Sequence, residues 1–208
     1  MWSNYWPKEL ATFQPKAVSK WHEEHVKETE VHKVIQYFFF SQWKKLKEYA
    51  NSKGISIVGD IPIFVASDSA DVWANQKLFQ LDSDGRSTAV AGVPPDYFSA
   101  TGQLWGNPLY NWDAMKKTGY KWWIDRIRAM LSVVDFVRID HFRGFEAYWS
   151  IPYGDETAVN GKWIDGPNIA LFDAIKKALG ELPIIAEDLG VITDGVRKLR
   201  DDAQFPGM

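Results

Sequence analysis

The chain has 208 residues and a formal net charge of -3, from 24 Lys and Arg against 27 Asp and Glu, so no basic excess points to nucleic acid as a partner. It contains no cysteine, which excludes disulfides and thiolate metal sites and fits a cytoplasmic location. The longest apolar runs fall far below the roughly 20 residues of a membrane-spanning helix, and the N-terminus lacks a signal-peptide pattern, so we expect no membrane partner.

The first third of the chain predicts one helix followed by one strand. Residues 1–19 show no clear period and are interpreted as the remainder of a truncated element. From Val31 to Lys53 apolar residues recur at helical spacing, and Gly54 is placed to end that helix. Residues 55–58 then predict a short buried strand that is finished before Pro62.

A long irregular segment follows, rich in Gly, Pro, Asp, Asn and aromatic residues. Its aromatic content argues against disorder, so we expect an inserted loop or subdomain at about 64–113 that covers one face of the domain. After it the predicted elements alternate: a helix over 120–134, a strand over 136–140, a helix over 168–179, a strand over 183–186, and a last helix capped by Thr193 or Asp194. This alternation predicts an α/β fold with a parallel sheet.

Two of these strands end in acidic residues. The apolar run that begins at Val137 leads to Asp140, and the run that begins at Ile184 leads to Glu187. Buried parallel strands deliver side chains to one rim of a sheet or barrel, so the two carboxylates are expected to lie near each other. Such a pair can serve as the nucleophile and the acid of an enzyme that acts on glycosidic bonds.

The residues beside Asp140 strengthen this hypothesis, but each of them also has a simpler structural interpretation. Arg138 shares a strand face with Asp140, and it can either form a structural ion pair or keep a nucleophilic carboxylate ionised. His141 can hydrogen-bond a substrate hydroxyl, although a lone histidine in a strand is more often a satisfied core group.

Glu187 carries the same ambiguity. A hydrophobic collar and the neighbouring Asp188 suit a general acid, whereas two rim carboxylates that face solvent or bind a divalent ion are the simpler interpretation. Asp60 adds a third acidic residue at a predicted strand end. The 11 tryptophans mostly indicate an aromatic core, but Trp105, Trp112 and Trp163 lie in Gly, Pro or Asn-rich segments and can stack on sugar rings.

Five blocks of sequence, in this order, carry a resemblance to a known family: Gly59 to Ala66, Ala91 to Ser99, Gly102 to Tyr110, Val137 to Phe145, and Ile185 to Gly190. They resemble the amylomaltases, also called 4-α-glucanotransferases or disproportionating enzymes. The resemblance implies part of a (β/α)₈ TIM barrel of the α-amylase clan, about three parallel strands with helices. It also implies retaining double displacement on α-1,4-glucans, without a metal or other cofactor.

The resemblance also implies roles by position. Asp140 corresponds to the nucleophile and Glu187 to the general acid/base. The residues with implied substrate-binding roles are Asp60, Arg138, His141, Tyr97, Phe98, Trp105, Asn107 and Asp188.

The family has a third catalytic carboxylate in a His-Asp motif on a later strand, and no such motif occurs before Met208. The chain is therefore expected to be an internal fragment, truncated at both ends, with little or no transferase activity by itself. Unpaired sheet edges in such a fragment favour self-association.

Two other functions fit the same residues. A barrel enzyme could hold Mg²⁺ on Asp140, Glu187 and Asp188. A non-catalytic glucan-binding module would account for the tryptophans and the missing strands.

Overall fold

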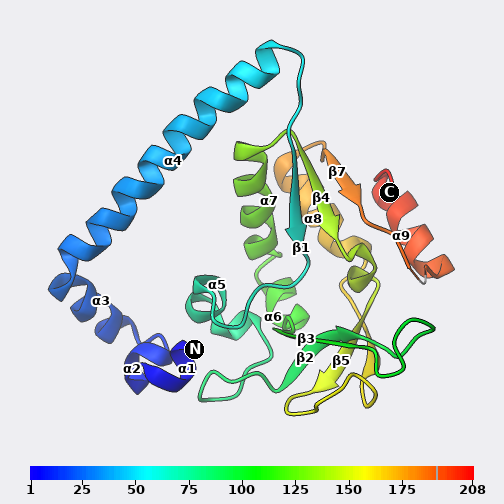
Figure 1. Cartoon of the computed structure of the whole chain (residues 1–208), viewed down its shortest axis with the longest axis horizontal. Helices are drawn as coiled ribbons and strands as arrows, with labels where there is room; N and C mark the ends of the chain where they lie inside the picture. Colours follow the sequence, from blue (N-terminus) through cyan, green and yellow to red (C-terminus); the bar gives the residue numbers. More distant parts are fainter. Residues whose placement is uncertain (191) are drawn as a thin grey trace.

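A computed structural model describes residues 1–190 and 192–208 and contains a parallel sheet in the order β1-β4-β7 (Figure 1). The strands are β1 (Val58–Pro62), β4 (Phe136–Asp140) and β7 (Ile184–Ala186). In this register Asp60 lies opposite Arg138, and Pro62 lies opposite Asp140. The expected α/β architecture with three parallel strands is confirmed.

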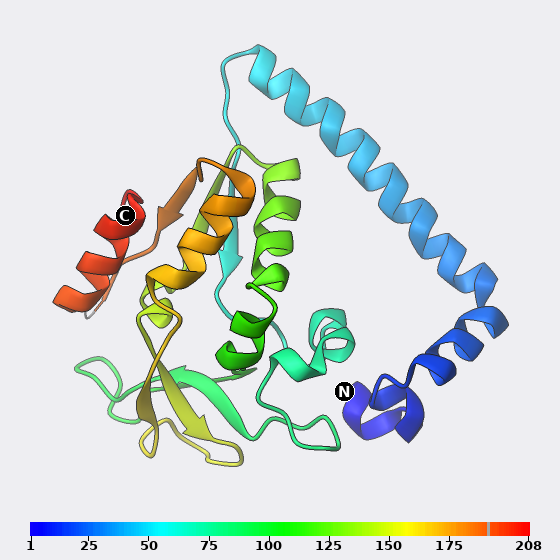
Figure 2. The same cartoon turned by 180° about the vertical axis from the view of Figure 1, so that it is seen from behind.

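Two helices cover one face of this sheet, as Figure 2 shows from behind: α7 (Lys121–Val133) and α8 (Ile169–Leu179). Val137 and Ile139 of β4 are fully buried, while Phe136, Arg138 and Asp140 alternate with them and remain accessible. The core therefore lies between the sheet and these helices, and the polar residues of β4 lie on the other face. Helix α9 (Asp194–Ala203) follows β7, and Thr193 caps it through the backbone N–H of Val196.

The first strand differs from its prediction. Residues 55–58 were expected to form it and Pro62 to lie beyond it, whereas β1 begins at Val58 and includes Pro62. A proline is accepted in this position because β1 is the edge strand of the described sheet and Pro62 is its last residue. Asp60 therefore lies within the strand, two residues before the level of Asp140, rather than at its end.

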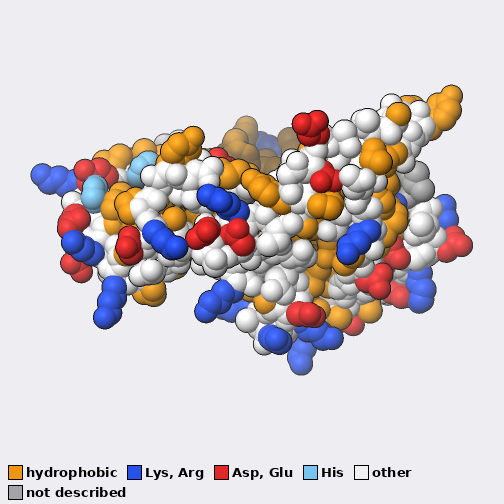
Figure 3. Space-filling model, turned by 90° about the horizontal axis from the view of Figure 1, so that it is seen from below, with side chains coloured by type: hydrophobic (Ala, Val, Ile, Leu, Met, Phe, Trp, Pro, Cys, Tyr) orange, Lys and Arg blue, Asp and Glu red, His pale blue; other side chains and the backbone are white. Residues whose placement is uncertain are grey.

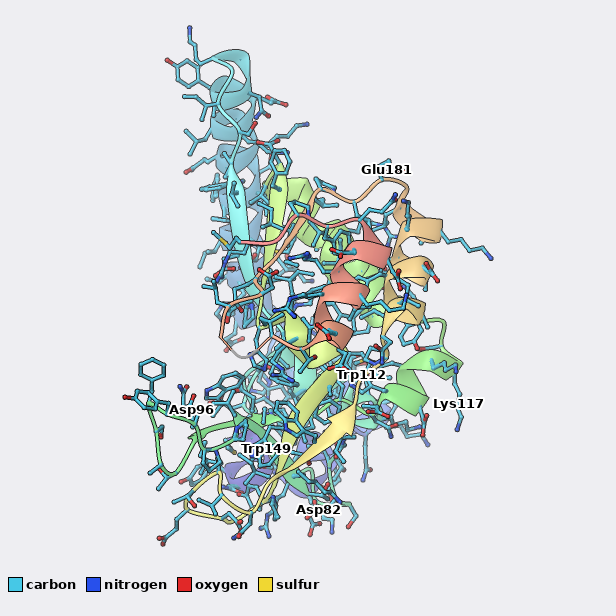
Figure 4. All side chains as sticks on the ribbon, turned by 90° about the vertical axis from the view of Figure 1, so that its right-hand side faces the viewer. Asp82, Asp96, Trp112, Lys117, Trp149 and Glu181 are labelled. Atoms are coloured by element: carbon cyan, nitrogen blue, oxygen red, sulfur yellow. The ribbon has the colours of Figure 1, made fainter. Side chains whose placement is uncertain are left out.

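A second, antiparallel sheet lies beyond the rim of the first, in the order β3-β2-β5-β6 (Figure 4). The predicted insertion supplies β2 (Ala89–Val93) and β3 (Gln103–Pro108), and a later segment supplies β5 (Ala147–Pro152) and β6 (Lys162–Asp165). Short helical segments surround this sheet: α5 (Ala70–Ala74), η1 (Gln76–Leu78), α6 (Trp112–Lys117) and η2 (Phe142–Phe145). The second sheet thus draws on residues beyond the 64–113 insertion.

Residues 1–19, interpreted as the remainder of a truncated element with no clear period, belong to a helical N-terminal segment. It forms α1 (Trp2–Tyr5), α2 (Lys8–Ala11) and α3 (Pro15–Glu24). Helices α1 and α2 have four residues each, too few for a hydrophobic period to show in the sequence. A tertiary contact holds α2, where the indole of Trp73 donates to Leu10 O over 2.7 Å. Seen from below, hydrophobic side chains on the surface are interspersed with acidic and basic ones (Figure 3).

The helix predicted from Val31 to Lys53 is confirmed as α4 (Val26–Ser52), which starts earlier than predicted. This helix stands away from the sheets in Figure 1, and none of its residues is buried. Its C-terminal half is attached where the Trp43 indole donates to Val133 O over 2.6 Å and Lys47 pairs with Asp135 at 3.1 Å. Its apolar side chains, such as Val34 and Phe38, are about half exposed.

No helix in the described part of the chain has the length and apolar character to cross a membrane.

Candidate active site

Arg138 joins the two acidic residues of β1 and β4. Its Nη1 lies 2.7 Å from Oδ1 of Asp60 and 3.1 Å from Oδ1 of Asp140. The hydrogen bond to Asp60, and then the charges of both carboxylates, raise the pKa of Arg138. The predicted pairing of Arg138 with Asp140 is present, and Asp60 shares it because parallel pairing sets Asp60 directly opposite Arg138. The guanidinium therefore lies between two carboxylates and fixes both.

Glu187 follows β7 and is attached to the end of β4. Its backbone N–H donates to Ile139 O over 3.0 Å, which continues the parallel pairing by one residue. Its carboxylate accepts from the backbone N–H groups of His141, at 2.8 Å to Oε2, and of Leu189, at 2.9 Å to Oε1. His141 adopts a left-handed backbone conformation, with φ of 53°. The structure thus brings Asp140 and Glu187 to the same rim of the sheet, on adjacent strands.

The His141 imidazole is packed against this rim as a neutral group. Burial, and then the charge of Arg143, lower the pKa of His141 to about 4. Its ring meets that of Trp105 edge-on, with 4.7 Å between centroids. Among the described residues its Nε2 is buried without a hydrogen-bond partner. A neutral imidazole can donate or accept a hydrogen bond, as a substrate hydroxyl requires.

A cavity of about 180 Å³ opens at this rim. It is lined by residues from β1, β3 and β4 and the segments that follow them: Pro62, Ile63, Phe64, Trp105, Asn107, Asp140 and His141. Asn107 is oriented by its side-chain amide, which donates to Val65 O over 3.0 Å. Pro62, Ile63 and Phe64 were not predicted as site residues, although they belong to the first block that carries the family resemblance.

Tyr97 and Phe98 lie apart from this cavity. They are 97% and 94% exposed and their rings contact each other edge-on. The loop that carries them joins β2 to β3 and projects from the antiparallel sheet, where Figure 4 labels Asp96. The Asp96 carboxylate accepts from the backbone N–H groups of Phe98 and Ser99, at 2.8 Å each, and so shapes the tip of the loop.

The two other tryptophans considered for sugar contact differ from Trp105. Trp112 is partly buried and packs against Tyr110 and Phe145 in the main core. Trp163 is 41% exposed on β6 and lies edge-on to Trp149. Neither lines the cavity at Asp140.

Asp188 points away from that cavity, toward α9. Its Oδ2 lies 2.5 Å from Nη1 of Arg200, and its Oδ1 accepts from the backbone N–H of Met208 over 3.0 Å. Within residues 1–190 and 192–208, no group of three or more His, Asp or Glu side chains is arranged to hold a metal ion. The three carboxylates considered as Mg²⁺ ligands, Asp140, Glu187 and Asp188, therefore form no such group.

Acidic residues at the ends of adjacent parallel strands, beside a cavity that an indole and an imidazole line, define an α/β domain with a candidate active site at the rim of its sheet. A sequence profile of glycoside hydrolase family 77, described as 4-alpha-glucanotransferase, matches residues 1–208, and the chain belongs to this family.

Similar proteins extend well beyond the matched region. The 4-alpha-glucanotransferase of Streptococcus pneumoniae is 54% identical over 207 residues, which is 100% of this chain and 41% of that protein. That of Thermus thermophilus is 52% identical, over 99% of this chain and 41% of its own length. The structure of amylomaltase from Streptococcus agalactiae in complex with acarbose superposes with a TM-score of 0.95 at 46% identity, covering 100% of this chain and 42% of that one. The family resemblance is confirmed, and the chain spans about two fifths of these relatives.

Proposed function

We propose that the protein is a 4-α-glucanotransferase that moves α-1,4-glucan segments between maltooligosaccharides, with Asp140 as nucleophile and Glu187 as general acid/base. One observation carries the proposal. The two carboxylates end neighbouring strands of a parallel sheet, and each is held by its own polar contact, Asp140 by Arg138 and Glu187 by the backbone of His141. Family membership supports the assignment of the reaction.

The reaction follows the retaining double displacement of paired carboxylates. Glu187 protonates the oxygen of the departing glucan while Asp140 attacks the anomeric carbon, which breaks the glycosidic bond and forms a glucosyl-enzyme ester. The 4-hydroxyl of a second sugar then attacks the same carbon, Glu187 takes its proton, and the Asp140 ester is released. Arg138, 3.1 Å from Oδ1 of Asp140, holds this carboxylate in place for the first step.

The neighbouring residues would bind and orient the sugar. His141 offers a neutral ring nitrogen for a hydroxyl, Trp105 offers an apolar face beside it, and Asn107 borders the same cavity. Asp60 forms an ion pair with Arg138 through Oδ1, and its other carboxylate oxygen can accept a hydrogen bond from a sugar hydroxyl. Transfer requires that an acceptor sugar be held while water is excluded. We propose that the exposed rings of Tyr97 and Phe98 contact the glucan and supply that control.

Disproportionation of maltotriose tests the function. A working transferase is expected to convert maltotriose into glucose and longer oligomers. Asp140→Asn and Glu187→Gln are expected to abolish transfer, whereas Asp155→Asn, in the turn after β5, serves as the matched control and should retain it. Maltooligosaccharide binding without turnover, unchanged in Asp140→Asn, would instead indicate a non-catalytic glucan-binding module. The cytoplasmic location stays a prediction.

A further inference from the structure

Asp188 occupies a site built from three separate parts of the chain. Its Oδ2 is bound by Arg200 of α9 at 2.5 Å, and its Oδ1 by the backbone N–H of Met208 at 3.0 Å. The side chains of Asp188 and Arg200 are 13% and 26% exposed, so this pair is better shielded from water than most of the ion pairs on the surface. The carboxylate has both oxygens engaged by the protein.

The segment that carries Met208 is packed closely around this pair. Pro206 O accepts from the backbone N–H of Ala186 over 2.9 Å, so the segment runs along the outer edge of β7. A Cβ on Gly207 would lie 2.6 Å from Oδ2 of Asp188 and 2.9 Å from Nη1 of Arg200. A side chain at position 207 would therefore require the Asp188 or Arg200 side chain to shift.

Arg200 is itself held in place. Its Nε and Nη2 donate to Oδ1 of Asp201 at 3.0 and 2.8 Å, while its Nη1 faces Asp188. The planar guanidinium presents these donors in a rigid fork, which a lysine cannot reproduce. Helix α9 therefore offers Asp188 a donor of fixed direction.

Glu187 and Asp188 are consecutive residues whose side chains are bound on opposite sides of the chain. The Glu187 carboxylate is bound on the β4 side, by the N–H of His141, and the Asp188 carboxylate on the α9 side. Because the two residues share one peptide bond, fixing the Asp188 side chain restrains the backbone that carries Glu187. The strand end is thus held between β4 and α9.

We propose that Asp188 and Arg200 form a positioning pair that holds the Glu187 carboxylate in its working orientation. Asp188 then acts through the backbone and not as the substrate contact that the sequence suggested. This inference rests on the proposed role of Glu187 as acid/base. A displacement of about 1 Å at a reacting group can lower a rate about 100-fold, so loss of the pair is expected to affect turnover more than binding.

The test uses Asp188→Asn and Arg200→Met in the full chain, with Arg200→Lys as the conservative variant. Lys198→Met is the matched control, because it removes an exposed pair with Asp202 on the same helix. The first measurement is hydrogen exchange at the backbone N–H groups of His141 and Leu189, the two donors to Glu187, compared with Ile127 in α7. The second is the kcat and KM of maltotriose disproportionation.

Exchange at His141 and Leu189 is expected to rise at least about tenfold in Asp188→Asn and Arg200→Met, with Ile127 and the Lys198→Met control unchanged. The kcat should fall about 10 to 100-fold with KM within about twofold, and Arg200→Lys should recover part of it. Unchanged exchange at both amides, an equal rise throughout the chain, or an unchanged kcat would overturn the proposal. If the unmodified protein shows no transfer, the proposed function fails, while the exchange measurement still decides whether the pair positions Glu187.

Discussion

The backbone N–H of His141 donates to Oε2 of Glu187 over 2.8 Å, a contact between residues 46 positions apart. It joins the segment after β4 to the segment after β7, next to Asp140. The left-handed conformation of His141, which few residues other than glycine adopt, occurs where this bond is made. The relative placement of the two proposed catalytic carboxylates is therefore set by main-chain geometry.

Replacing Arg138 by lysine should impair the site without unfolding the domain. Lysine keeps the positive charge, but it cannot reach both Asp60 and Asp140 with the geometry of a guanidinium. We expect a loss of about 100-fold in kcat/KM for maltotriose. Arg128→Lys, at an exposed pair with Asp125 on α7, is the control and should retain its rate. Equal rates in the two variants would contradict the role given to Arg138.

His141 makes stability depend on pH in a predictable direction. Its folded pKa of about 4 lies below its ordinary value of 6.5, so between these values the unfolded chain binds more protons. The contribution of His141 to the free energy of unfolding is therefore complete above about pH 6.5, and this contribution is lost as the pH falls toward 4. At about 1.4 kcal/mol per pH unit, the difference is about 3 kcal/mol. Urea unfolding at pH 4.5, 5.5 and 6.5 measures it, and His141→Gln should remove this part of the slope. The same slope in both proteins would refute the assignment.

Gly92 in β2 is expected to be intolerant of a side chain. A Cβ there would overlap the backbone O of Gln103 in β3, so Gly92→Ala must push the two strands apart. Overpacking against a backbone atom should lower the free energy of unfolding by about 3 kcal/mol and, by moving β3, displace Trp105 and raise KM. Gly106→Ala is the control. Its added Cβ meets open space, so only the strain at φ +77° remains, about 1 kcal/mol. Similar losses in both variants would argue against the overlap.

Self-association through the sheet edge can be tested at Val58. This residue begins β1, the edge strand of the described parallel sheet, and is 56% exposed. Sedimentation velocity of the 208-residue chain is expected to show association that grows with concentration, and Val58→Lys should weaken it, because a charge on an edge strand opposes pairing. Val159→Lys places the same charge at a similarly exposed valine away from this edge and should leave association unchanged. A monomer at every concentration would exclude this association.

The local hydrophobic pattern was sufficient to predict the bounds of several elements. The bounds of β4 agree with the predicted strand, and α7 and α8 lie within a residue or two of theirs, because each has a continuous apolar period. The hydrophobic pattern did not reveal α1 and α2, which have four residues each, and a contact of Trp73 with Leu10 holds α2. It also misplaced β1, because the sequence does not show that Pro62 would lie on an edge strand, where a missing N–H is accepted.

The alternation of helices and strands, the acidic residues near the strand ends, and the family motifs that point to Asp140 and Glu187 could all be inferred from the order of residues. The groups that hold these carboxylates became known only from the folded arrangement. Arg138 is shared with Asp60 because parallel register aligns them, and Arg200 reaches Asp188 from a helix 12 residues further along the chain. Such contacts depend on strand register and on the packing of distant segments, which leave no periodic signal in the sequence.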